Sequence, residues 1–547
     1  MKSSTLLYFF LALAFADVLL SPPPTSYITA PPGYPDSSSS PVDVFAVSGT
    51  NNLVERKIQI GKMPQLNAEE SVAVLNQAVK AWDGGSGVWP QMTDAARIIA
   101  IERVVAKLAL SRQKMVDALM LEIGKSRKDA ESEFDRTIVF IKEAITEIKS
   151  GYLQENRKIG DVLALVKRSA IGVVLALGPA NYPLNELYAM AIPALLTGNV
   201  VVVKIPAVGG LVHLLTVEAF NEELPPHTLN FVSGGGRATC PSMMATGMVD
   251  GLAFIGSSNA ADSLIRSHPA PHRLKVFSQL EAKNYGVFLP SLFSSQNEEL
   301  LKASVDAAVS GSLSYNGQRC TALKLLLVPR EAAEKFVQLF VAAVDKLTVG
   351  LPWDEAVNIT PLPLSKNVEY MQELILDGEE QGAKVVNLKG GEVLGGTLMN
   401  PAVLFPIAHG AKLWEVEQFG PVVPIGVYEN IEEVIKMGRE GSYAQQISIF
   451  SGLRLEDAPA VANLVDKFRS VFGKVNINMA AGRSPDSLPF SGRRSSAMGT
   501  MSIRHALEAF TTETVVATKT NDDNAVVCGG LGGENFFNEV IKLSKFA

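Results

Sequence analysis

The 547-residue sequence is poor in cysteine and histidine, with three cysteines and six histidines. Cys240, Cys320 and Cys528 form an odd, sparse set, which excludes a framework of disulfides. His268 and His272 are four residues apart, but two prolines between them interrupt the helix that would place both rings on one face. The sequence therefore predicts no metal site.

Positive charge is also scarce. The net charge is -7 and no long basic run occurs, which argues against a nucleic-acid partner. Apolar residues are abundant at 47% of the chain. A chain of this length and composition predicts about three domains with large buried cores.

The N-terminal segment differs from the rest. Lys2 precedes an apolar run at 6–16 that ends in small residues, a pattern typical of a secretory signal peptide and short for a membrane span. We expect a signal-like segment at 1–20, a Pro- and Ser-rich linker at 21–50 and no membrane span in the mature chain. Secretory entry or a complex plastid is the expected location. The cytoplasm is the alternative, since a misassigned start codon would leave the same apolar tail.

Two regions alternate between strand and helix patterns. Such alternation predicts doubly wound parallel sheets, and dinucleotides bind at the strand ends of such sheets. In the first region the expected strands are 172–177, 200–204, 228–232 and 251–255, with helices at 183–196 and from 260. In the second, helices at 332–346, 366–381 and 431–439 accompany strands at 385–388 and 422–427. The β-rich stretch 509–519 is expected to pair with 162–166 as a separate ribbon.

Cys320 lies where catalytic side chains are often placed. It follows a polar, Gly-containing turn at 314–319, with a helical pattern at 300–312 before it and an apolar strand at 322–328 after it. A thiolate at such a loop is a candidate nucleophile. A small buried side chain is the alternative for an isolated cysteine.

Several short stretches, in order and spacing, resemble the aldehyde dehydrogenase superfamily over about residues 50–520. The stretches are Gly178-Pro179-Ala180-Asn181-Tyr182-Pro183, the strand end at Lys204, Phe254-Ile255-Gly256-Ser257, Gly317-Gln318-Arg319-Cys320, Glu417-Gln418-Phe419-Gly420-Pro421 and Pro489-Phe490-Ser491-Gly492. The resemblance implies an α/β fold of two doubly wound α/β domains plus a small β oligomerisation ribbon. The implied divisions are a dinucleotide-binding domain at 51–155 and 171–297, a catalytic domain at 298–495, a ribbon at 156–170 and 505–520, and a C-terminal tail at 521–547.

The stretches 315–322 and 482–486 look like the non-phosphorylating, NADP-dependent glyceraldehyde-3-phosphate dehydrogenases. The resemblance implies a small phosphorylated aldehyde as substrate, with its phosphate bound by Arg136, Tyr182, Arg319 and Arg483. Arginine suits this role because it donates bidentate, charge-assisted hydrogen bonds to phosphate.

The resemblance also implies a mechanism. The Cys320 thiolate would attack the aldehyde, Asn181 would stabilise the oxyanion, and water would hydrolyse the resulting thioester to 3-phosphoglycerate without an acyl phosphate. The family's general base position is Gln279 here, and a family glycine is Glu281. Residues two apart on a strand face the same side, so we expect Glu281 to act as the base from a displaced position. The alternative is that Glu281 pairs with Lys283 or faces solvent.

For the cofactor, the resemblance implies NADP, with NAD as the alternative. Lys204 would meet the adenosine ribose or its 2′-phosphate, and Ala207 stands where a carboxylate that would repel that phosphate often occurs. Gly256 and Ser257 would lie near the pyrophosphate, while Glu417 and Phe419 would hold the nicotinamide end.

Two other functions stay open at this point. The altered base motif allows an enzyme for another aldehyde, or one that passes the acyl group to coenzyme A. A pseudoenzyme with a binding role is the non-enzymatic alternative. Relatives form dimers or tetramers through the ribbon, so we expect a homo-oligomer.

Overall fold

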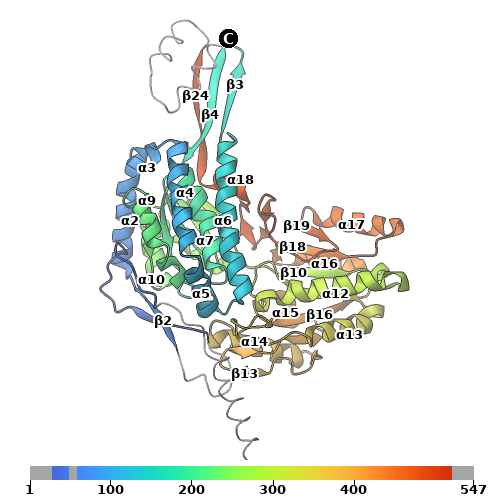
Figure 1. Cartoon of the computed structure of the whole chain (residues 1–547). Coiled ribbons are helices and arrows are strands. Elements are labelled where there is room, and N and C mark those ends of the chain that lie inside the picture. The colour runs from blue at the N-terminus through green and yellow to red at the C-terminus, as the bar shows by residue number, and fades with distance from the viewer. Residues whose placement is uncertain (1–26, 48–57, 520–547) are drawn as a thin grey trace, which may run out of the picture.

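The computed structural model describes residues 27–47 and 58–519. The expected signal-like segment 1–20 and tail 521–547 lie outside these ranges. Figure 1 shows two α/β domains side by side and a narrow ribbon that projects from the first. This arrangement confirms the predicted fold class.

The first domain contains a sheet in the order β22-β9-β8-β5-β6-β7. The strands from β9 to β7 are parallel, and β22 joins β9 antiparallel. β5 and β6 are buried at every position, as expected for strands covered by helices on both faces. The strands are β5 (Val173–Leu177), β6 (Val200–Lys204), β7 (Leu229–Val232), β8 (Gly251–Ile255), β9 (Lys275–Gln279) and β22 (Ala497–Met498).

Helices cover both faces of this sheet, and local signals fix several of their ends. Asn67 and Glu70 form the expected capping box at the start of α2 (Ala68–Trp82). Gly124 ends α5 (Arg112–Ile123) with a left-handed φ of 71°. The other main helices are α4 (Asp94–Leu110), α6 (Arg127–Lys149), α7 (Pro183–Leu196), α9 (Val217–Glu223), α10 (Gly236–Ala245), α11 (Ser258–Ser267) and α18 (Ile503–Ala509).

The second domain has a sheet in the order β12-β15-β16-β11-β10-β18-β19, parallel except at β12. β10 lies inside this sheet, so the predicted boundary at 297/298 is too late and the domains meet between β9 and β10. The strands are β10 (Asn284–Phe288), β11 (Leu323–Pro329), β12 (Lys384–Val385), β15 (Ala402–Phe405), β16 (Val422–Tyr428), β18 (Gln446–Phe450) and β19 (Lys474–Ile477). The main helices are α12 (Glu298–Leu313), α13 (Ala333–Val344), α14 (Ser365–Glu380), α16 (Ile431–Glu440) and α17 (Ala458–Phe468).

The ribbon consists of β3 (Gln154–Ile159), β4 (Val162–Ala170) and β24 (Thr511–Lys519), in the order β24-β4-β3. β24 pairs with β4 over its whole length, from Thr511 opposite Ala170 to Lys519 opposite Val162. The predicted pairing of these two distant stretches is therefore confirmed.

Part of the segment expected as a linker belongs to the fold. β1 (Val42–Phe45) pairs antiparallel with β2 (Gln59–Met63), and Val47 is buried. The linker prediction is therefore wrong for these residues. Pairing with β2 and burial of scattered apolar side chains outweigh the Pro- and Ser-rich composition.

Candidate active site

One cavity of about 710 Å³ brings together the thiol and most of the predicted site residues. It lies where the loops after β5, β8 and β9 of the first domain meet the loops before β11 and β20 (Phe490–Ser491). Its walls include Arg136, Asn181, Tyr182, Gly256, Ser257, Glu281, Arg319, Cys320, Glu417, Phe419 and Arg483. Lys204, the last residue of β6, and Ala207, three residues later, are not among the lining residues.

The Cys320 loop is held by an unusual turn and a buried lysine. Tyr315 and Asn316 adopt left-handed φ values of 49° and 56° between α12 and β11. Lys324 donates to the carbonyls of Arg319 at 2.7 Å and Cys320 at 2.9 Å. These contacts fix the position of the thiol at the predicted helix-to-strand junction.

The Cys320 thiol lies in an environment that disfavours its charge. Burial, and then the negative charge of Glu186, raise the pKa of the thiol to about 11. Lys324 and Arg483 oppose this shift. The thiol is therefore mostly protonated at neutral pH in the unliganded protein, and a nearby positive charge or a proton acceptor would activate it.

Asn181 approaches the thiol loop from the first domain. Its side-chain amide donates to the carbonyl of Gln318 at 2.7 Å, two residues before Cys320. The predicted oxyanion donor is thus beside the thiol loop. The amide nitrogen has a second hydrogen, which this bond leaves for another acceptor.

Two of the three predicted phosphate-binding arginines are already paired with carboxylates. Arg136 forms a bidentate ion pair with Asp486, at 3.0 and 2.8 Å. Arg483 contacts Asp486 at 3.0 Å and also pairs with Glu186. Within the described residues, the buried Nη2 of Arg483 has no hydrogen-bond partner, so it remains available to a substrate.

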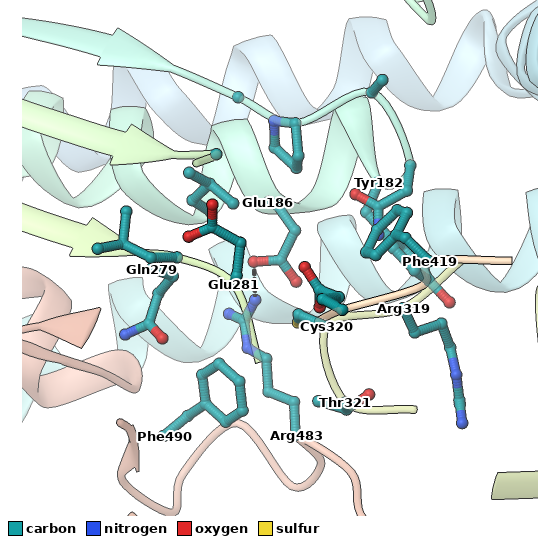
Figure 2. Close-up of a pocket in the computed structure, with 18 of the residues that line it drawn as sticks. Tyr182, Glu186, Gln279, Glu281, Arg319, Cys320, Thr321, Phe419, Arg483 and Phe490 are labelled. Carbon is teal, nitrogen blue, oxygen red and sulfur yellow. Dashed lines mark hydrogen bonds and ion pairs between the residues drawn. The ribbon is translucent and has the colours of Figure 1, made fainter. Parts of the chain in front are cut away.

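Arg319 and Tyr182 complete the predicted set in different ways. Arg319 donates to the carbonyl of Gly311 at 3.2 Å, and Figure 2 shows its side chain extending away from Cys320. The Tyr182 ring packs edge-on against Tyr315 and covers the ammonium of Lys125, which is 3.4 Å from the ring centroid. Lys125 in turn is paired with the buried Glu133.

Glu186, Lys125 and Lys324 are site residues that the sequence reasoning missed. Glu186 lies in the first turn of α7, in a helix whose other side chains are almost all buried. Lys324 is a charged residue inside the apolar strand β11. A charge within a buried apolar run is a signal that would have identified both residues.

The carboxylate of Glu281 is not directed as strand geometry predicted. β9 ends at Gln279, so residues 279 and 281 do not share a strand face, and that premise is wrong. Glu281 accepts a hydrogen bond of 2.8 Å from the backbone N–H of Ser258, the first residue of α11. Figure 2 shows its carboxylate pointing away from Cys320. Its role as a general base stays a prediction.

The groups expected to hold a dinucleotide fit that role with one exception. The N-terminus of α11 already binds an anion, the Glu281 carboxylate, where a pyrophosphate was expected. A Cβ on Gly256 would lie 2.6 Å from the Phe254 ring, so a larger residue in the turn before α11 would require that ring to shift. The exception is that Glu281 itself must move to free this terminus.

Two further residues of the expected cofactor site, Glu417 and Lys204, are charged. Glu417 accepts from the backbone N–H of Ala282 at 3.2 Å and pairs with Lys324 at 3.1 Å. Lys204 donates to the carbonyl of Ile205 at 2.6 Å and must turn to reach a ribose or a phosphate.

Residues 27–47 and 58–519 contain neither a metal-binding cluster nor a membrane-spanning helix. In these ranges no group of three or more His, Cys, Asp or Glu side chains is placed to hold a metal ion. The helices of the same ranges include none that is long and apolar enough to cross a bilayer.

Comparisons with known proteins agree with this geometry. The model of the aldehyde dehydrogenase family matches residues 52–516. An NADP-dependent glyceraldehyde-3-phosphate dehydrogenase from Streptococcus equinus is 31% identical over 83% of this chain and 92% of its own length. A lactaldehyde dehydrogenase from Methanocaldococcus jannaschii is 26% identical over 84% of this chain and 95% of its own.

The solved structures give the same result. A crystal structure of NADP-dependent glyceraldehyde-3-phosphate dehydrogenase from Bacillus halodurans, complexed with NADP, has a TM-score of 0.80 and 28% identity. It aligns with 91% of this chain and 100% of that one. The match over most of the chain and the convergence of the motifs on one cavity lead to one conclusion: the chain belongs to the aldehyde dehydrogenase family.

Proposed function

We propose that the protein oxidises glyceraldehyde 3-phosphate, or a similar small aldehyde, to its carboxylic acid through a thioester on Cys320, with NADP as cofactor. The observation that carries this proposal is the cavity in which Cys320 and four predicted phosphate-binding side chains meet. The NADP-dependent relatives support the choice of cofactor.

Within this mechanism each side chain has a separate task. Cys320 bonds to the aldehyde carbon, and the Asn181 side-chain amide donates to the oxygen. Glu417, held by Lys324, would bind the nicotinamide ribose, and Lys204 would contact the adenosine side. The bound cofactor supplies the acceptor for the hydride.

The substrate phosphate would share arginines with carboxylates of the chain. Arg136, Arg319 and Arg483 carry three positive charges, while Glu186 and Asp486 carry two negative charges. The unpartnered Nη2 of Arg483 favours an anionic substrate. The three existing ion pairs would have to rearrange around a dianion.

These ion pairs also favour a second candidate, an aldehyde without a phosphate group. A substrate with a neutral hydroxyl would leave all three arginine–carboxylate pairs intact. The similarity to a lactaldehyde dehydrogenase supports this candidate.

The test is NADPH formation without inorganic phosphate, from D-glyceraldehyde 3-phosphate and from lactaldehyde, with wild type and Cys320→Ser. Our proposal expects Cys320-dependent activity with the phosphorylated substrate, and a fall in kcat/KM of about 10²-fold in Arg483→Met. Equal use of both aldehydes, with no effect of Arg483→Met, would favour the second candidate. Activity that requires coenzyme A would show that coenzyme A, and not water, accepts the acyl group.

We also propose that the protein forms a homodimer or homotetramer through the ribbon. All of β3 is exposed, and most of β24 is exposed, so this ribbon buries little against its own chain. Its apolar side chains Ile159 and Val515 are 70% and 59% exposed. Apolar groups on a projecting sheet are suited to contact with a second copy.

A further inference from the structure

Hydrolysis of a thioester needs a group that removes a proton from water, and Gln279 cannot supply one. Its side chain is an uncharged amide. Both polar atoms of this amide are buried in the cavity wall without a partner among the described residues. The base must therefore be another side chain of the same cavity.

Glu281 and Glu417 are each held by contacts with their own chain. The Glu281 carboxylate accepts from the N-terminus of α11 and points away from Cys320 (Figure 2). Glu417 is tied to Lys324 and to the backbone of Ala282. The Glu417 charge also raises the pKa of the Cys320 thiol, but its effect is smaller than that of Glu186.

Glu186 is the remaining carboxylate in the cavity wall. It lies in the first turn of α7, five residues after Asn181, and its side chain keeps 15% of its exposure. Figure 2 shows its carboxylate beside the Arg483 guanidinium and on the Cys320 side of the cavity. Its ion pair with Arg483 holds this carboxylate in the cavity wall.

We propose that Glu186 is the general base that activates water for release of the acyl group from Cys320. This inference rests on the proposed thioester mechanism, and it gives the base role to a residue that lies far in sequence from Gln279. Its charge also raises the pKa of the Cys320 thiol, which agrees with a carboxylate placed close to the sulfur.

The step balances without an added reactant. The Glu186 carboxylate accepts one proton from water while the water oxygen bonds to the thioester carbon. The tetrahedral intermediate collapses, the C–S bond breaks, and Cys320 leaves as a thiolate. The proton on Glu186 passes to that thiolate or to solvent, and the acid product leaves.

The test uses hydrolysis of p-nitrophenyl acetate without cofactor. The activated ester acylates Cys320 directly, so the assay separates the acylation burst from steady-state deacylation. We expect Glu186→Gln to retain one nitrophenolate per site in the burst and to lose about 10²- to 10³-fold in deacylation rate. Mass spectrometry would then show the acetyl group accumulating on Cys320.

Hydroxylamine distinguishes a base from a residue that only orders the site. It attacks thioesters without needing a base to remove its proton first, so it should restore turnover of Glu186→Gln to near the wild-type rate. Failure of this rescue, or a burst that falls in parallel with turnover, would show that Glu186 only holds Arg483 in place.

Matched variants control for the ion-pair network and for charge. Asp486→Asn removes the other carboxylate partner of Arg483, and we expect it to change the KM of the substrate but not the ratio of burst to steady state. Glu334 is an exposed acid on α13, and Glu334→Gln should change neither the KM nor the ratio of burst to steady state. Loss of deacylation in Glu281→Gln instead of Glu186→Gln would overturn the proposal in favour of Glu281.

The proposed dehydrogenase function has a separate readout. Normal ester hydrolysis with no oxidation of any aldehyde would refute that function and leave the base assignment standing. A deacylation rate in Glu186→Gln within threefold of the wild-type rate would refute the base assignment alone. If Glu186→Gln does not fold, Glu186→Asp keeps the charge for Arg483 while retracting the carboxylate from the thiol, and it should also accumulate acyl-enzyme.

Discussion

The carboxylate of Glu281 occupies the N-terminus of α11, where it accepts a hydrogen bond of 2.8 Å from the backbone N–H of Ser258. A helix N-terminus attracts anions, and the same terminus was expected to receive the pyrophosphate of a dinucleotide. In this chain the protein's own carboxylate and the cofactor would compete for one donor.

This competition predicts that Glu281→Gln binds NADP more tightly than wild type. The repulsion between this carboxylate and the cofactor phosphates costs about 1 kcal/mol, so its removal should lower the Kd about 3- to 10-fold. Isothermal titration calorimetry without aldehyde would measure the Kd. Because salt screens the repulsion, the difference in Kd between variant and wild type should become smaller at high ionic strength. Equal or weaker binding by the variant would contradict the prediction.

A second prediction concerns the reactivity of Cys320 towards iodoacetamide. Since burial and Glu186 raise the pKa of the thiol to about 11, the thiolate is a minor species at neutral pH. The alkylation rate should therefore rise about tenfold per pH unit between pH 7 and 10, with no plateau in that range. Peptide mass spectrometry on Cys320 gives the rate. A plateau near pH 8 would show an activated thiol already in the free enzyme.

Lys324 provides a third prediction, about stability. It pairs with Glu417 and supports the carbonyls of Arg319 and Cys320, and its side chain is only 1% exposed. Lys324→Met should lower the free energy of unfolding by about 3 to 5 kcal/mol, because it leaves the buried Glu417 charge without its partner. Urea denaturation would measure this loss. The double variant with Glu417→Gln should recover part of it, whereas an additive loss would rule out the pair as the cause.

The fourth prediction tests the ribbon as a subunit contact. Replacing the exposed Ile159 and Val515 by lysine places charges on the surface that we propose to be buried between copies. We expect the mass measured by light scattering to fall towards the monomer, with little change in the melting temperature of the core. An unchanged mass would locate the subunit contact elsewhere.

Local sequence patterns predicted most elements of the fold. The helix 183–196 and the strand 200–204 have the expected bounds. The signals that set these bounds are local: a proline in the first turn of the helix, a Gly-Asn pair after its end, and a run of β-branched residues in the strand. The pairing of 509–519 with 162–166 followed from β propensity together with the family resemblance. In these cases the determining interactions are close in sequence or repeated along a strand.

The interior of the candidate site was less predictable, since its contacts join distant parts of the chain. Arg483 and Glu186 are 297 residues apart, and Arg136 and Asp486 are 350 apart. No local pattern reports such a pair. The direction of Glu281 depended on the end of β9 at Gln279, and strand ends are difficult to fix from sequence alone.

The antiparallel pairing of β22 with β9 has a consequence for synthesis of the chain on the ribosome. The first sheet is assembled mostly from residues 173–279, but the edge at β9 stays unpaired until residues 497–498 have been translated and have left the exit tunnel. A nascent chain that stalls in the second domain would present this edge to other chains. Shielding of β9 by a chaperone during translation would favour correct assembly of the cavity between the two domains.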